Sequence, residues 1–169
     1  SYRVLPLRSA TPTDRGAETV DEAVLENDYY RLELDPHSGA ITRLLVKEGD
    51  WDALRGGANV VAMEEDRGDL WEPYRPLDGA SNIAMKERHP APEADGAAFS
   101  NAKADERGTV KRGPVVSEFE LARPLGETGR FSTTIRLYAG LPRIDIHTEI
   151  LNNEEFVRYR VLFPTTIAR

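Results

Sequence analysis

The sequence predicts an all-β fold, an antiparallel β-sandwich, and three observations lead to this prediction. Between residues 115 and 163, apolar residues recur at every second position in four successive runs, which is the period that places side chains on one face of a strand. Short segments rich in turn-forming residues separate these runs. The N-terminal half carries further short alternating runs, and many short strands with frequent turns are typical of a sandwich or barrel.

The chain begins with a segment that we expect to lie outside the main fold. Residues 1–23 are predicted to form a lead-in strand and a linker, and residues 24–169 the sandwich domain. Residues 9–22 are polar, contain Pro12 and Gly16, and show no sustained periodicity, so they are predicted to be a connector.

The next segment predicts a hairpin. Tyr30, Leu32 and Leu34 alternate with polar residues, which indicates a strand with one buried face. Residues 35–39, Asp-Pro-His-Ser-Gly, supply a tight turn, and residues 40–46 return as a second strand. Residues 59–64 are a candidate third strand, and residues 50–55 carry the one short helical signal, which ends at two consecutive glycines.

The middle of the chain has little apolar content. Residues 89–108 are rich in Ala, Asp, Glu and Pro, with Phe99 as the one aromatic residue. We expect a loop here, with a strand whose apolar partners lie elsewhere as the alternative.

The C-terminal runs give the clearest faces. Each run sets one group of alternating residues on the face predicted to be buried: Val115, Ser117, Phe119 and Leu121; Phe131, Thr133, Ile135 and Leu137; Ile144, Ile146, Thr148 and Ile150; Val157, Tyr159, Val161 and Phe163. The short connections predict an antiparallel meander. If residues 152–155 form the last hairpin tip, Asp145 and Glu149 lie among Arg158 and Arg160 in cross-strand pairs, which contribute about 0.2–1 kcal/mol each.

Composition excludes several classes of function. The 169 residues include no cysteine, so disulfides and cysteine-based metal sites are excluded. A formal net charge of -7 argues against a nucleic-acid partner and against an anionic membrane surface. No apolar run is long enough to span a membrane, and the first residues lack the pattern of a signal peptide. We expect a cytoplasmic location, with which the absence of cysteine is compatible.

The sequence by itself shows no catalytic constellation. His37, His89 and His147 form no HxH or HExxH pair, so we interpret each as structural. Gly56 and Gly57 lack the frame of a phosphate-binding loop, and no GxSxG elbow is present.

One acidic segment stands out because aromatic residues lie within it. Its carboxylates surround Trp71 and Tyr74 and comprise Glu64, Glu65, Asp66, Asp69 and Glu72. The simplest interpretation is a solvated acidic loop whose Trp71 fills the core. A sugar-contacting loop is the alternative, and a catalytic carboxylate pair is a third possibility, because glycosidases use two carboxyl groups at a defined separation.

Several segments, in order, resemble the β-rich region that follows the catalytic domain in family 38 glycoside hydrolases, the α-mannosidases. They cover nearly the whole chain: Ser1-Tyr2-Arg3-Val4, the stretch from Leu25-Glu26-Asn27 to Ile41, Gly113-Pro114-Val115, the stretch from Arg136 to Ile146, and Phe163-Pro164.

The resemblance implies a galactose-mutarotase-like supersandwich, present here in part, with Arg169 as a truncation point within a larger fold. It implies that the zinc ligands and the aspartate nucleophile belong to a preceding barrel domain, so no cofactor is expected in this chain. It also makes Asp69, Trp71 and Tyr74 the counterparts of a segment that contacts the substrate.

Three functions remain open at this point. The first is a non-catalytic β domain of an α-mannosidase-like glycosidase, with the catalytic domain of the same polypeptide and carbohydrate as partners; the chain alone would not be an enzyme. The second is an aldose-epimerase-like enzyme using His89, His147 and Glu149. The third is a free-standing carbohydrate-binding module. A broad exposed apolar surface favours the first, because it indicates a missing neighbour.

Overall fold

The computed structural model describes residues 17–66 and 97–167, and these form β-strands without any helix. The prediction of an all-β antiparallel sandwich is confirmed. The strands are β1 (Glu18–Val20), β2 (Val24–Glu26), β3 (Tyr30–Leu34), β4 (Ile41–Val46), β5 (Trp51–Asp52), β6 (Val60–Glu65), β7 (Ala97–Phe99), β8 (Thr109–Arg112), β9 (Val116–Leu125), β10 (Gly129–Tyr138), β11 (Ile144–Leu151) and β12 (Val157–Leu162).

One layer is a five-stranded sheet with the order β1-β8-β9-β10-β11. Its centre is the pair of ten-residue strands β9 and β10, which are in register from Gly129 opposite Leu125 to Tyr138 opposite Val116. The predicted inner face of β10 is confirmed, because its four alternating residues from Phe131 to Leu137 are at most 1% exposed. Strand β1 lies inside the segment predicted to be a connector and pairs with β8.

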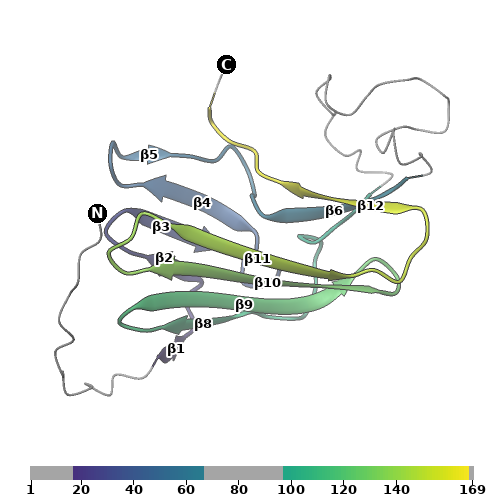
Figure 1. Ribbon diagram of the computed structural model, residues 1–169, viewed down its shortest axis with the longest axis horizontal. Helices are drawn as coiled ribbons and strands as arrows, with labels where there is room; N and C mark the ends of the chain where they lie inside the picture. Colours follow the sequence, from purple (N-terminus) through teal and green to yellow (C-terminus); the bar gives the residue numbers. More distant parts are fainter. Residues whose placement is uncertain (1–16, 67–96, 168–169) are drawn as a thin grey trace, which may run out of the picture.

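The opposite layer consists of two smaller sheets, with the orders β2-β3-β4-β5 and β12-β6-β7. A bridge between Ile41 and Ala58 joins them. In Figure 1, β4 and β5 lie at the upper left, β6 and β12 at the upper right, and β8 to β10 below them. The hairpin of β3 and β4 and the strand at residues 60–65 agree with the sequence-based expectations.

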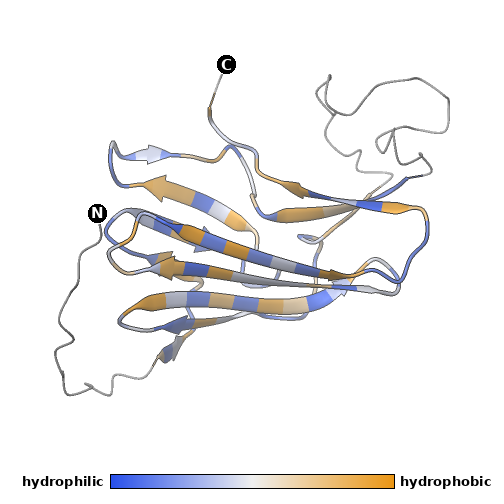
Figure 2. Cartoon of the chain, in the orientation of Figure 1, coloured by the Kyte–Doolittle hydropathy of each residue, from blue (hydrophilic) through white to orange (hydrophobic). Residues whose placement is uncertain are grey.

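The core fills the space between the layers. Leu25, Leu32 and Ile41 from one layer belong to the same buried cluster as Phe119 and Ile135 from the other. Figure 2 shows the reason along β9, β10 and β11, where hydrophobic and hydrophilic residues alternate. A strand with this alternation can bury one face while the other stays in water.

The expected meander ends one strand early. Strand β12 does not return along β11; it crosses to the other layer and pairs with β6, with Arg158 opposite Glu64 and Val161 opposite Val61. The predicted contacts of Asp145 and Glu149 with Arg158 and Arg160 are therefore wrong. The physical reason is that β6 supplies both a buried apolar face and a buried carboxylate for these arginines.

Two further expectations need correction. Residues 50–55 contain no helix, because Trp51 and Asp52 pair with Val46 and Leu45 as strand β5. The predicted loop contains strand β7, whose Phe99 lies opposite Ala62. The alternative expectation, a strand whose apolar partners lie elsewhere in the chain, is confirmed. Local periodicity could not reveal this short strand, because its partners are distant in sequence.

Candidate functional site

The residues predicted to contact carbohydrate, Asp69, Trp71 and Tyr74, lie outside the described residues. The acidic segment to which they belong begins at Glu64 on strand β6, and its first three residues are described. Glu72 also lies outside the described residues. The part of the candidate site that can be built is therefore the carboxylate cluster at the end of β6.

Glu64 accepts three hydrogen bonds from two arginines of β12. Its Oε2 accepts from Arg158 Nε at 3.2 Å and from Arg160 Nε at 2.7 Å, and its Oε1 accepts from Arg160 Nη2 at 2.8 Å. The antiparallel register brings the three side chains together, since Arg158 lies opposite Glu64 and Arg160 follows two positions later on the same face. Asp66 lies 3.9 Å from Arg158 at the end of the cluster.

The surroundings of Glu64 keep its carboxylate in the charged form. Its side chain is 10% exposed, and burial by itself raises the pKa of Glu64. The hydrogen bonds from Arg160 and Arg158 outweigh this effect, so the pKa is lowered from its ordinary value. A general acid at neutral pH needs a raised pKa, so Glu64 has the charge state of a structural ion pair.

The two described histidines lie apart from this cluster in the chain. His37 lies in the turn between β3 and β4, where its Nδ1 is 2.9 Å from the carbonyl oxygen of Glu106. His147 is exposed on β11, with its Nε2 3.1 Å from Glu149 Oε1. The structure thus brings together two of the three residues of the epimerase hypothesis, whereas His89 lies outside the described residues.

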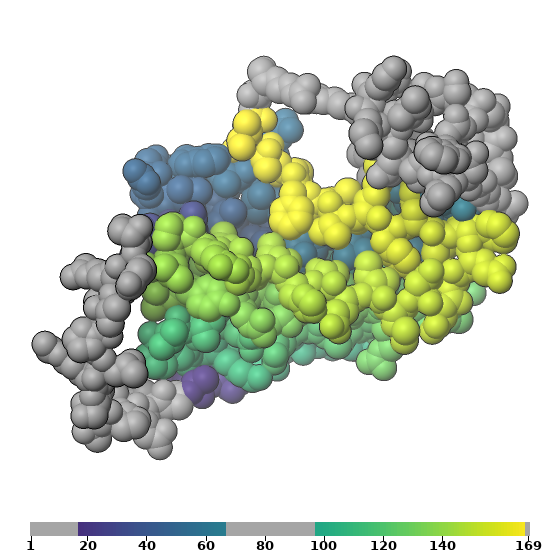
Figure 3. Space-filling view, in the orientation of Figure 1, coloured from purple at the N-terminus to yellow at the C-terminus, as the bar shows by residue number. Residues whose placement is uncertain are grey.

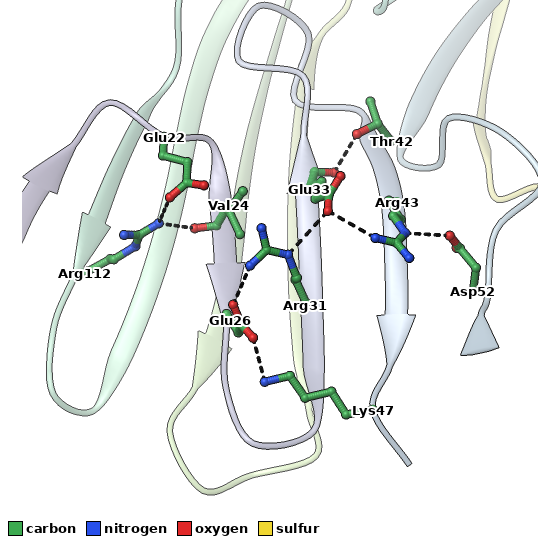
Figure 4. A network of polar contacts seen from close by, with 10 residues as sticks. All are labelled: Glu22, Val24, Glu26, Arg31, Glu33, Thr42, Arg43, Lys47, Asp52 and Arg112. Carbon is green, nitrogen blue, oxygen red and sulfur yellow. Dashed lines mark hydrogen bonds and ion pairs between the residues drawn. The ribbon is translucent and has the colours of Figure 1, made fainter. Parts of the chain in front are cut away.

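A ladder of ion pairs covers the outer face of the four-stranded sheet (Figure 4). It runs from Glu26 to Arg31 at 2.7 Å, on to Glu33 at 3.3 Å, to Arg43 at 3.5 Å, and to Asp52 at 2.9 Å. These side chains are 35–45% exposed, and exposed pairs contribute about 0–1 kcal/mol each. The ladder therefore contributes little to stability and leaves this face strongly polar.

The pKa shifts along the ladder have local causes. The hydrogen bond from Lys47 is the largest influence that lowers the pKa of Glu26. The hydrogen bond from Arg43 likewise lowers the pKa of Asp52. Both carboxylates are held in the charged form by ion pairs with neighbouring side chains. Neither of these two carboxyl groups is therefore prepared to act as a general acid.

Asn27 connects the two layers, a role that sequence reasoning missed although Asn27 belongs to the motif at residues 25–41. Its Nδ2 donates to the carbonyl oxygens of Tyr138 at 2.8 Å and Leu141 at 3.0 Å. Its Oδ1 accepts from the backbone N–H groups of Tyr29 and Tyr30. One side chain thus ties the turn after β2 to the turn after β10, more than 100 residues away along the chain.

Exposed apolar side chains gather toward the C-terminal end of the chain. Val161 is 46% exposed, Phe163 48% and Ile167 70%, and we call these three residues, which lie at alternate or nearby positions of the last strand and the segment after it, the apolar rim. Strands β11 and β12 are each the outermost strand of a sheet, and Figure 3 shows the C-terminal residues, in yellow, running across one surface of the molecule. Unpaired strand edges with exposed apolar side chains mark a surface for a neighbour.

The described residues contain neither a cluster of metal-ligating side chains nor a helix suited to a membrane. Within residues 17–66 and 97–167, no group of three or more His, Asp or Glu side chains is placed to hold a metal ion. No helix in the same residues is long and apolar enough to cross a membrane.

Comparison with known families gives a match over most of the chain. Residues 25–169 match the glycosyl hydrolases family 38 C-terminal domain. No curated protein matches the sequence.

Proposed function

The chain belongs to glycosyl hydrolase family 38, and we propose that it is the non-catalytic β domain of an α-mannosidase-like enzyme, packs on the catalytic domain of the same polypeptide and helps to shape its carbohydrate site. The reaction itself belongs, in this proposal, to the catalytic domain. The zinc ion that the family implies is held there as well.

The apolar rim is the observation that carries the packing part of the proposal. Val161 lies on the same face of β12 as Tyr159, which packs against the core, yet Val161 is 46% exposed. The inward face of β12 is thus covered by the core at Tyr159 and exposed to water from Val161 to Phe163. Covering such a face removes apolar area from water at about 25 cal/mol per Å², which favours a permanent neighbour.

The Glu64 cluster supports the carbohydrate part of the proposal. The acidic segment that holds Asp69, Trp71 and Tyr74 starts at Glu64, and two arginines fix that residue at the end of β6. Aromatic rings stack on the apolar faces of sugars, and a carboxylate accepts hydrogen bonds from hydroxyl groups. We propose that Trp71 and Tyr74 stack on the sugar and that Asp69 orients it.

The packing is tested in the full-length enzyme with the double variant Val161→Asp, Phe163→Ser. We expect lower activity and separate unfolding of the two domains in calorimetry, because a charge then faces the proposed interface. Leu141→Ser is the matched control, since Leu141 is 50% exposed but lies in the turn between β10 and β11. Equal behaviour of the double variant and the control would contradict the packing.

The carbohydrate contact is tested by steady-state kinetics. Trp71→Ala is expected to raise KM about tenfold, which corresponds to about 1.4 kcal/mol of lost binding. Trp51→Ala is the control, because Trp51 is 41% exposed and lies on β5. An unchanged KM in Trp71→Ala would refute the contact, and turnover of a mannoside by the purified chain alone would refute the non-catalytic role.

A further inference from the structure

Strand β9 carries a cation on its inward face. The alternation that buries Phe119, Leu121 and Leu125 also places Arg123 on that face, and Arg123 is only 6% exposed. Arginine is almost never this buried unless it is paired. The sequence signals the position through its spacing of two residues from each neighbouring leucine.

The hydrogen bonds of Arg123 are incomplete. A guanidinium group has five N–H donors. Nη1 donates to the carbonyl oxygen of His37 at 3.0 Å, and the buried Nε has no hydrogen-bond partner. In the part of the chain that the structure describes, no carboxylate pairs with this guanidinium. A buried charge without a counter-ion costs several kcal/mol. Because Nε is itself shielded from solvent, an anion that offsets this cost has to pair with the Nη groups.

Arg123 lines a hollow on the protein surface that has room for an anion. The hollow has a volume of about 570 Å³ and lies between strand β7, the loop that follows it, and the end of β9. The hollow is open to solvent on one side, so a molecule bound there stays partly exposed. Alanines, Phe99 and Leu125 supply an apolar wall.

The residues that line the hollow include more cations than carboxylates, and the carboxylate of Glu154 lies beside the lining residue Gly126, where it accepts hydrogen bonds from the backbone N–H groups of Glu127 and Thr128. Besides Arg123, Lys103 and Glu106 line it, and both are exposed to solvent. Among the lining residues, two cations and one carboxylate leave one positive charge in excess. The cation that is withdrawn from water is Arg123, so the attraction for an anion is strongest where solvent screens least.

We propose that this hollow binds a small organic anion, whose carboxylate or phosphate group pairs with Arg123 and whose body packs on Phe99 and Leu125. A guanidinium group matches both oxyanions, because its planar N–H groups donate in parallel to two oxygens. Binding would supply the missing counter-charge of Arg123. This site shares no residue with the apolar rim or with the acidic segment, so it stands independently of the proposed packing and carbohydrate contact.

The test is an NMR titration of the chain in low salt, following the side-chain Nε–H signal of Arg123. The probes are inorganic phosphate, glucose 6-phosphate and glucuronate, with glucose as the neutral control. We expect saturable shifts with at least one anion, weaker binding in high salt, and no response to glucose. Binding of the phosphates alone, or of glucuronate alone, supports the proposal and identifies the preferred group.

Variants of opposite sign make the test specific. Lys103→Gln should weaken binding about two- to fivefold and Glu106→Gln should strengthen it by a similar factor, because each exposed charge contributes up to about 1 kcal/mol. Both residues are exposed, so neither variant should disturb the fold. Arg123→Met should abolish binding, with circular dichroism reporting whether the fold persists. A lack of response to all three anions, equal binding of glucose, or affinities unaffected by both exposed variants would overturn the proposal.

Discussion

The ion-pair cluster of Glu64 should be the polar group whose loss costs this fold most. In Glu64→Gln the side chain keeps its volume, but the carboxylate that accepts three hydrogen bonds from Arg158 and Arg160 becomes a neutral amide. One amide oxygen cannot replace two charged oxygens, and the new NH₂ group points its hydrogens at a cation.

The magnitude follows from the burial of the three side chains. Breaking a fully buried pair by removing one partner costs about 3–5 kcal/mol, whereas an exposed pair is worth less than about 1 kcal/mol. The side chains of Arg158 and Arg160 are 22% and 16% exposed, so water reaches them in part. We expect a loss of about 2–3 kcal/mol in the free energy of unfolding, equivalent to a fall in Tm of about 4–12 °C.

The assay is urea unfolding of the chain at pH 7, followed by far-UV circular dichroism. Glu33→Gln is the matched control, because Glu33 also contacts two arginines but its side chain is 36% exposed; its loss should stay below about 1 kcal/mol. A double-mutant cycle with Arg160→Gln should show coupling above about 1 kcal/mol. Equal losses for Glu64→Gln and Glu33→Gln would refute the assigned role of burial.

Three further predictions concern the core, a turn and acid stability. Phe119→Ala should lower the free energy of unfolding by about 3–5 kcal/mol in urea titrations, since Phe119 is fully buried. Gly39→Ala should cost more than Gly140→Ala, measured as Tm: both glycines have φ near +70°, but an added Cβ would lie 2.7 Å from Thr133 Cγ2 at Gly39 and meets nothing within 4 Å at Gly140. The folded-state pKa of Glu64 is lowered, so its stabilising contribution is present above its ordinary pKa of 4.5 and is lost as the pH falls through the lower folded value. The free energy of unfolding should therefore fall less on acidification in Glu64→Gln than in the unchanged protein. The same dependence of unfolding free energy on pH in both proteins would contradict this sign.

The sequence carried most of the information about the strands and their faces. The period of two along residues 131–137 correctly predicted a face that is at most 1% exposed. The turn at residues 35–39 correctly predicted a hairpin between β3 and β4. Both features depend on near neighbours in the chain. A strand with one apolar face turns that face toward the core, because the opposite orientation would expose the apolar side chains to water.

The sequence correctly predicted pairing between consecutive strands, as in β9 to β11 and in β3 with β4, but it was a poor guide to pairing between distant segments. The alternation in β12 predicted a buried face, but Val161 and Phe163 of that face are 46% and 48% exposed. The short connection from β11 suggested a hairpin, which the structure does not contain. The pairing with β6 depends on Glu64, which offers a buried carboxylate to Arg158 and Arg160. That preference arises between segments more than 90 residues apart.

The candidate sites divide in the same way. Residue types marked the acidic segment, and the family resemblance singled out Asp69, Trp71 and Tyr74 within it; these assignments remain predictions. Nothing in the local sequence indicated that Asn27 ties two turns together or that Arg123 lies beside a hollow. The period of two determined that Arg123 points inward, whereas the lack of a counter-ion is a property of the assembled layers. Local periodicity sets the face of each residue, and only tertiary packing decides what that face meets.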